Sequence, residues 1–184
     1  MSIVDFKRFN GFAKRRLDDR ILTDLLHGDI FNESDMHSAA YYYIRDYFRK
    51  KGRGNIYVRC EPQLGGMKPD IVVYEGVNPV YAFEFKMFKK PDCINENAIE
   101  ADLMKLASVV EQFPSFRWGF FQMIYDCDLP YSYSDARLRR AGFERVSVTT
   151  INARRKEGTN RRRVGYDRWR EGFDRLGVGH QKHA

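Results

Sequence analysis

The sequence predicts an α/β protein in which a mixed central sheet is flanked by helices. Segments with helical periodicity and segments with strand character follow one another in the order α–β–β–β–α–β. The final strand of this series, residues 116–124, is an almost unbroken apolar run. Such a run is typical of a strand buried on both faces, and after a helical crossover we expect it to lie parallel to the strand before it.

Two helical segments are expected in the N-terminal part of the chain. Apolar residues recur at roughly helical spacing through residues 1–27, and Gly28 marks a stop. A second helix is expected to begin at Asn32, a favourable N-cap, with Asp35 three residues later as its capping-box partner. It should end near Lys51, because a Gly-Arg-Gly-Asn segment follows.

Three strands are expected next, over residues 56–60, 71–74 and 80–86, which are rich in β-branched and aromatic residues. A loop containing Gly and Pro separates the first two. The Gly-Val-Asn-Pro segment at 76–79 supplies turn chemistry, so the third strand should return beside the second. Apolar spacing then predicts a helix over 98–113, ended by a proline. A short helix over residues 136–141 and a last strand over residues 145–151 should follow the 116–124 strand.

Length and composition favour one folded domain. The chain has 184 residues, 43% of them hydrophobic, which is too apolar for a disordered protein. No apolar stretch is long enough for a membrane span, and the first residues lack a secretory signal, so we expect a cytoplasmic protein without a membrane partner. We assign residues 1–152 to the domain and 153–184 to a basic C-terminal extension that should dock on it.

The three cysteines, Cys60, Cys93 and Cys127, are widely spaced and include no Cys-x-x-Cys pair. This odd number and spacing argue against a disulfide framework and against a thiolate zinc site. We expect reduced, mostly buried thiols.

The formal net charge of +7 is concentrated in residues 154–170. Eight basic residues oppose Glu157 and Asp167 there, a local net charge of +6; they are Arg154, Arg155, Lys156, Arg161, Arg162, Arg163, Arg168 and Arg170. Clustered cations of this kind favour a polyanion partner, because phosphates release condensed counterions on binding. A solvated, solubilising tail is the alternative interpretation.

The strand over residues 80–86 carries the most informative polar residues. Alternation places Tyr81, Phe83 and Phe85 on one face and Ala82, Glu84 and Lys86 on the other. The aromatic face should belong to the core. The other face places a carboxylate and an ammonium group about 6.6 Å apart along the strand, at ~3.3 Å per residue. Charges on a covered strand require a partner or a metal ion.

The preceding strand should bring Asp70 to the same place. If the turn leaves Glu75 near Val80, Asp70 falls within one residue of the segment 84–86. Two adjacent carboxylates favour a hard divalent cation, Mg²⁺ or Mn²⁺. Lys86 would then hold a water molecule or help to deprotonate it, while the metal acidifies that water.

Pro69-Asp70, thirteen intervening residues and then Glu84-Phe85-Lys86 make the sequence resemble the PD-(D/E)xK nuclease superfamily, which is restriction-endonuclease-like in fold. The resemblance covers about residues 32–124 and implies an αβββαβ core. It implies that Asp70, Glu84 and the Phe85 carbonyl would bind the metal and that Lys86 would act on the water.

The resemblance implies a metal-dependent nuclease that hydrolyses phosphodiester bonds, in DNA rather than RNA, as a homodimer or as a subunit of a larger complex. Two other functions remain open. One is a catalytically inactive nucleic-acid-binding or scaffold module on the same fold. The other is a basic structural protein whose charged strand face is a protein interface. For the motif itself the alternative interpretation is a cross-strand ion pair between Glu84 and Lys86 on a solvated face, with Pro69-Asp70 an ordinary turn before a strand.

Further candidates come from segments around these strands. Members of the family often add an acidic residue from the first core helix, which here is Glu33, with His37 one turn later; helix-dipole and half-buried polar roles are the alternatives. Glu61 would face the metal or be a strand-end surface charge. Lys68 is a candidate phosphate contact, as are Arg154, Arg155, Lys156, Arg161, Arg162 and Arg163 in the extension.

Asp102 and Lys105 lie in the helix after the Glu-x-Lys strand and resemble a pattern common at that place in the family. A surface ion pair between positions i and i+3 explains them equally well.

Overall fold

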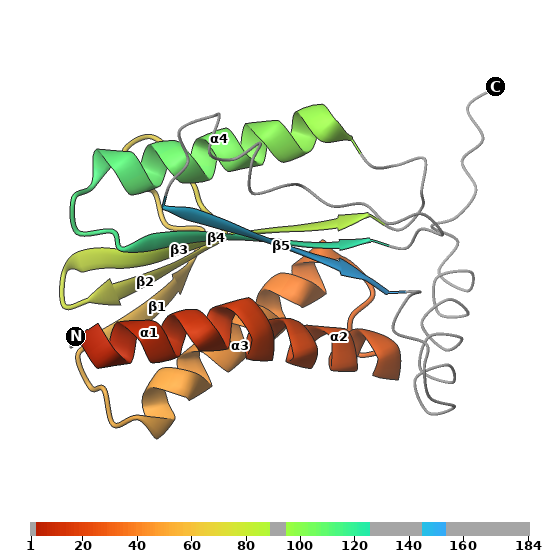
Figure 1. The fold of residues 1–184 in the computed structure, drawn as a ribbon, viewed down its shortest axis with the longest axis horizontal. Coiled ribbons are helices and arrows are strands. Elements are labelled where there is room, and N and C mark those ends of the chain that lie inside the picture. The colour runs from red at the N-terminus through yellow and green to blue at the C-terminus, as the bar shows by residue number, and fades with distance from the viewer. Residues whose placement is uncertain (1–2, 89–94, 126–144, 154–184) are drawn as a thin grey trace.

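The computed structural model describes residues 3–88, 95–125 and 145–153, and Figure 1 shows their arrangement. The elements in chain order are α1 (Ile3–Gly11), the π-helical turn η1 (Phe12–Arg16), α2 (Leu17–His27), α3 (Glu33–Lys50), β1 (Ile56–Cys60), β2 (Ile71–Glu75), β3 (Asn78–Phe88), α4 (Glu96–Gln112), β4 (Trp118–Tyr125) and β5 (Val146–Asn152). The predicted α–β–β–β–α–β order is confirmed from α3 to β4. The short helix expected over 136–141 and the basic extension lie outside the described residues.

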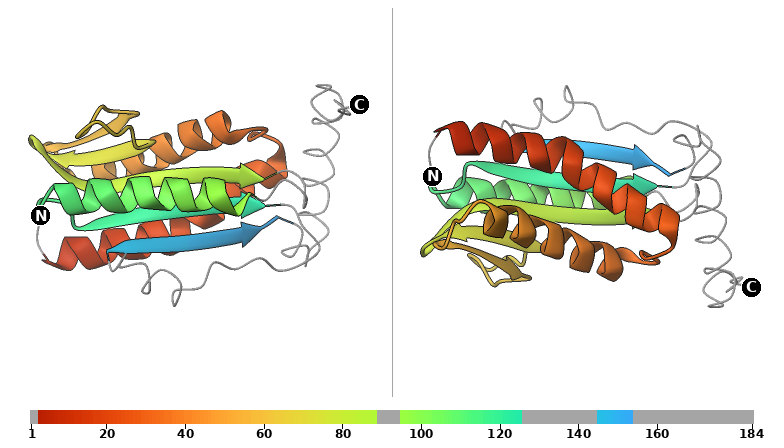
Figure 2. Two further views of the ribbon diagram at one scale, coloured as in Figure 1. Left: turned by 90° about the horizontal axis from the view of Figure 1, so that it is seen from above. Right: turned by 90° about the horizontal axis from the view of Figure 1, so that it is seen from below.

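The five strands form one mixed sheet in the order β1-β2-β3-β4-β5. The β1–β2 and β2–β3 pairs are antiparallel, whereas β3–β4 and β4–β5 are parallel. Helices α1, α2 and α3 lie on one face of the sheet and α4 lies on the other (Figures 1 and 2). The prediction of a mixed sheet flanked by helices is therefore confirmed. The strand expected over residues 116–124 is observed as β4, Trp118–Tyr125, and is parallel to β3 as predicted.

Each face of β3 belongs to a different hydrophobic cluster. Tyr81, Phe83 and Phe85 are buried beneath the N-terminal helices, as the alternation predicted. Ala82 is buried in the second cluster, which α4 covers. The face that carries Glu84 and Lys86 is consequently also a covered face, and charges on it lie close to the protein interior.

The β2–β3 hairpin differs in register from the expected one. Its turn contains only two residues, so Glu75 lies opposite Asn78 and not near Val80. A β-bulge then leaves Val80 without an opposite residue, because Tyr74 pairs with Pro79 and Val73 pairs with Tyr81. The shorter turn and the extra residue nearly cancel, which is why Asp70 still reaches residues 84–86.

The N-terminal helical region contains a feature that periodicity did not predict. At η1 the backbone N–H of Leu17 donates to the carbonyl of Phe12, five residues earlier. The amide of buried Gln122 in β4 donates to the Ala13 carbonyl at 2.8 Å and to Asp18 at 2.6 Å. A polar side chain of the sheet thus satisfies a helix carbonyl at the π-helical turn.

Cys60 corrects one expectation. Its thiol is exposed, not buried, because Cys60 ends the edge strand β1, which has a neighbouring strand on only one side. Cys93 and Cys127 lie outside the described residues. No helix in the described ranges has the length and apolar character that crossing a bilayer requires.

Helix α4 packs closely on β4 at Gly119. A β-carbon at this position would lie 3.0 Å from Leu106 Cγ and 3.1 Å from Val110 Cγ2. We predict that Gly119→Val lowers the free energy of unfolding by about 1–3 kcal/mol, because the added methyl groups overpack this contact. Urea unfolding monitored by circular dichroism measures the change. Gly54→Val is the control, since no atom lies within 4 Å of a β-carbon there; equal losses in both variants would contradict the prediction.

Candidate metal and catalytic site

The candidate site lies where β2 and β3 separate, a place we call the β2–β3 fork. Strand β2 begins at Ile71, opposite Phe83, whereas β3 continues to Phe88. The edge of β3 beyond Phe83 therefore has no β2 partner, and two carboxylates occupy the place of the missing strand. The Phe85 N–H donates to Asp70 Oδ2 at 2.8 Å, and the Met87 N–H donates to Glu33 Oε2 at 3.1 Å.

The N-terminus of α3 positions Glu33 at this fork. The Asn32 side chain accepts a hydrogen bond from the Asp35 N–H at 2.9 Å, as predicted for the N-cap. The Asp35 carboxylate accepts from the Phe31 N–H at 2.9 Å, one residue earlier than the predicted capping-box donor. Two side chains thus fix the first turn of α3, from which Glu33 reaches the edge of β3.

Glu84 is the most deeply buried charged group of the fork, with an exposed fraction of 1%. Its Oε2 lies 2.7 Å from Lys105 Nζ of α4, while its Oε1 is buried with no hydrogen-bond partner in the structure. Burial, followed by the nearby charge of Asp70, raises the pKa of Glu84 from 4.5 to about 9. Even with Lys105 beside it, this carboxylate therefore ionises only at high pH unless a further cation joins it.

Lys86 lies between acids from two helices. Its Nζ is 2.9 Å from Asp102 of α4 and 3.6 Å from Glu33 of α3. Burial lowers the pKa of Lys86, but the hydrogen bond to Asp102 and the charges of Glu33, Asp102 and Asp70 outweigh that effect and raise it. The ammonium group is consequently held in its charged form.

Asp70 has a second neighbour in His37. His37 Nε2 lies 3.3 Å from Asp70 Oδ2 without forming a hydrogen bond, and its ring packs against Phe85 with centroids 5.6 Å apart. Burial raises the pKa of Asp70, although His37 and the Phe85 N–H oppose that shift. His37, which the sequence left undecided, therefore belongs to the site, one helical turn from Glu33.

Glu61 and Lys68 form an ion pair with each other beside the fork. Both side chains are about half exposed, at 52% and 51%. The Glu61 N–H donates to the Asp70 carbonyl at 2.8 Å, which extends the β1–β2 pairing by one step and holds the backbone of Asp70. Lys68, a predicted phosphate contact, is thus engaged by Glu61, and the other predicted phosphate contacts, from Arg154 to Arg163, lie outside the described residues.

Asp102 and Lys105 are the site residues that the sequence could not assign. They contact each other at 3.5 Å, as an i,i+3 pair would, but each also binds a residue of β3. Their side chains are 19% and 29% exposed, so this is not an ordinary surface pair. The signal in the sequence was their position, one turn apart in the helix after the Glu-x-Lys strand.

The fork has an excess of carboxylates. Four of them, from Glu33, Asp70, Glu84 and Asp102, surround the two ammonium groups of Lys86 and Lys105. Within the described ranges, no group of three or more His, Cys, Asp or Glu side chains has an arrangement ready to hold a metal ion. The donor chemistry fits a hard cation nonetheless, because Glu84 Oε1 has no hydrogen-bond partner and Asp70 is near enough for its charge to raise the pKa of Glu84.

No family model, curated protein or solved structure matches this chain.

The burial of Glu84 leads to a pH-dependent prediction for the metal-free protein. The folded chain binds the Glu84 proton more tightly than the unfolded chain, because the pKa rises from 4.5 to about 9 on folding. The stability contributed by this group is therefore complete below pH 4.5 and is lost as pH rises towards 9. We predict that Glu84→Gln is more stable than the parent protein by on the order of 1–3 kcal/mol at pH 8 and by much less at pH 5.

Urea unfolding in EDTA between pH 5 and pH 9 measures this difference. Glu111→Gln is the matched control, since Glu111 is an exposed residue of the same helix that supplies Lys105. A stability difference between Glu84→Gln and the parent protein that does not change with pH would show that Glu84 does not titrate as described.

Proposed function

We propose that this protein is a metal-dependent phosphodiesterase that cleaves nucleic acid, with DNA favoured over RNA, and that its fold is of the restriction-endonuclease-like, PD-(D/E)xK kind. The observation that carries the proposal is the β2–β3 fork, where Asp70, Glu84 and Lys86 come together around the unpaired edge of β3. Glu84 and Lys86 follow Asp70 by 14 and 16 positions in the sequence, and the register of the β2–β3 hairpin brings the three residues together.

The residues suited to hold Mg²⁺ or Mn²⁺ are Asp70 and Glu84, with the Phe85 carbonyl as the further ligand that the motif implies. The buried, unpartnered Oε1 of Glu84 and the raised pKa values of both acids support this assignment. Such an ion, when bound, acidifies a coordinated water molecule and neutralises charge on the phosphoryl group. Glu84 can act as a ligand through Oε1 while Lys105 keeps its contact with Oε2.

Lys86 is better suited to orient a water molecule or a phosphate oxygen than to deprotonate water. Its ammonium group is held charged by Asp102 and Glu33, so it has no lone pair with which to take a proton. It can donate hydrogen bonds to a water molecule or to a phosphate oxygen at the fork. Glu33, whose Oε1 lies 3.6 Å from Lys86 Nζ, is the positioned carboxylate through which a proton could leave.

The alternative is a catalytically inactive nucleic-acid-binding or scaffold subunit on the same fold. The contact that favours it is the 2.7 Å ion pair between Lys105 and Glu84, because an ammonium group there already supplies a cation to the buried carboxylate. In this alternative the fork stabilises the fold, and nucleic acid is contacted by the basic extension and not by the fork. A homodimer or a larger complex is compatible with both functions.

The proposal predicts metal-dependent cleavage. Purified protein should cut labelled single- or double-stranded DNA with Mg²⁺ or Mn²⁺ and not with EDTA, and Lys86→Ala should cut at least about 100-fold more slowly, because it loses a positioned donor at the reacting phosphate. Lys14→Ala is the matched control, since Lys14 packs over Trp118 away from the fork. Binding of DNA without cleavage by the parent protein, in the presence of either metal, would favour the inactive module.

Metal binding can be tested independently of nucleic-acid cleavage. Millimolar Mg²⁺ or Mn²⁺ should raise the melting temperature of the parent protein, because a ligand that binds only the folded chain stabilises it by mass action. Asp70→Asn and Glu84→Gln should lose that response, whereas Glu111→Gln should keep it. A metal response that survives in Asp70→Asn would place the cation elsewhere and remove Asp70 from the site.

A further inference from the structure

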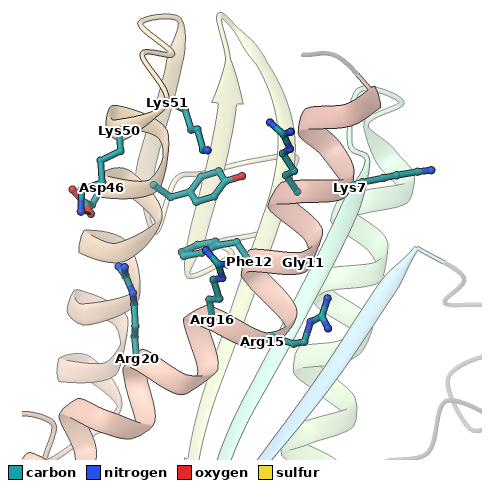
Figure 3. Close-up of a pocket in the computed structure, with 11 residues that line it drawn as sticks. Lys7, Gly11, Phe12, Arg15, Arg16, Arg20, Asp46, Lys50 and Lys51 are labelled. Atoms are coloured by element: carbon teal, nitrogen blue, oxygen red, sulfur yellow. Dashed lines mark ion pairs between the residues drawn. The ribbon is translucent and has the colours of Figure 1, made fainter.

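A basic groove lies between the N-terminal helices and the C-terminal half of α3 (Figure 3). The β2–β3 fork lies at the opposite end of α3, where the helix begins at Glu33. The groove encloses about 850 Å³. Its lining cations are Lys7, Arg8, Arg15, Arg16 and Arg20 from the α1–η1–α2 region and Lys50 and Lys51 from the end of α3. Arg16 and Arg20 extend towards α3, whereas Lys7 and Arg15 extend away from it (Figure 3).

The groove contains a single carboxylate, Asp46, and that carboxylate is already neutralised. Asp46 lies 2.9 Å from Arg49 and 2.7 Å from Lys50, and the hydrogen bond to Lys50 leads the effects that lower its pKa. No ion pair is formed within the described chain by Lys7, Arg8, Arg15, Arg16 or Lys51. Clustered exposed cations repel one another, and a bound anion relieves that repulsion.

The extent of the groove indicates a linear anion. Arg8 and Arg20, which both line the groove, are twelve residues apart along one helical segment, which corresponds to about 18 Å at 1.5 Å per residue. That length matches roughly five base pairs of duplex at ~3.4 Å each. A single small anion would occupy only a fraction of it.

The apolar residues of the groove argue against a membrane surface. Phe12 and Tyr47 stack with ring centroids 4.5 Å apart, and Phe12 is 5% exposed, so its ring is not available to enter a bilayer. The exposed large hydrophobic side chains among the described residues lie elsewhere, on Tyr42, Tyr57, Val77 and Met104. Exposed cations over a buried apolar floor fit phosphates that stay at the surface.

We propose that this groove is a second nucleic-acid contact, which binds backbone phosphates about 20 Å from the β2–β3 fork along α3. Glu33 stands at the first turn of that helix and Asp46 at its last turns, which gives the separation at 1.5 Å per residue. The groove contacts phosphates without reading bases, so it contributes affinity and register but no sequence preference. Nucleic acid as the occupant rests on the proposed function; binding itself does not require catalysis.

The test is fluorescence anisotropy of a labelled 20-base-pair duplex with the full-length protein in EDTA, over a series of salt concentrations. The triple variant Arg8→Gln/Arg16→Gln/Lys51→Gln should bind roughly tenfold or more weakly at low salt. The slope of log affinity against log salt should fall in magnitude by about two to three, at ~0.9 per lost phosphate contact.

The control triple variant is Arg45→Gln/Arg53→Gln/Arg59→Gln, which removes the same charge from the groove on the other side of α3, against β1. It should keep its affinity within about threefold. Equal losses of duplex affinity in both triple variants would show that binding depends only on net charge and would overturn the proposal. No loss of affinity in either variant would also overturn it. Parent protein that binds anionic phospholipid vesicles but not the duplex, with the vesicle binding lost in the first variant, would also overturn it. Duplex binding that depends on the groove, together with no cleavage in Mg²⁺, would uphold the groove and refute the nuclease.

Discussion

The unequal lengths of β2 and β3 are the constraint on which the candidate site depends. Because β2 begins opposite Phe83 while β3 runs five residues further, backbone N–H groups of Phe85 and Met87 face away from any strand partner. Buried N–H groups require acceptors, and a carboxylate makes a stronger acceptor than a neutral group. Asp70 and Glu33 supply them. The same hydrogen bonds that complete the edge of the sheet thereby hold two acids beside the charged face of β3.

The other half of the fork comes from α4. The helix lies close to the sheet because Gly119 of β4 has no side chain to separate the strand from Leu106 and Val110 of α4. This close approach brings Lys105 within 2.7 Å of Glu84 and Asp102 within 2.9 Å of Lys86. The two charged residues of β3 are thus each matched with an opposite charge from the same helix, one turn apart. Apolar packing of Leu106 and Val110 on Gly119 thus positions the charged side chains of the preceding turn of α4.

Local patterns in the sequence predicted the elements well and the contacts less well. Strand and helix bounds follow from periodicity, which is a local property, so the observed elements from α3 to β5 agree with the expected ones within about two residues. The register depended on the length of the turn and on the bulge at Val80, and only their near-cancellation kept Asp70 at the predicted place. The π-helical turn is hydrogen-bonded by Gln122, which is 104 positions from Asp18, and no local pattern contains that contact.

The burial of Glu84 bears on the choice between an enzyme and an inert module. A carboxylate with an exposed fraction of 1% and a pKa near 9 reduces the stability of the folded chain at neutral pH, and Lys105 only partly offsets this cost. An inert module would gain nothing from this loss of stability, because an apolar residue or a glutamine at position 84 would destabilise the folded chain less. A protein that binds a divalent cation at the fork gains from the same burial, since the low dielectric strengthens the attraction between cation and carboxylates. The energetic penalty at Glu84 is therefore itself an argument for the metal-binding function over the inert one.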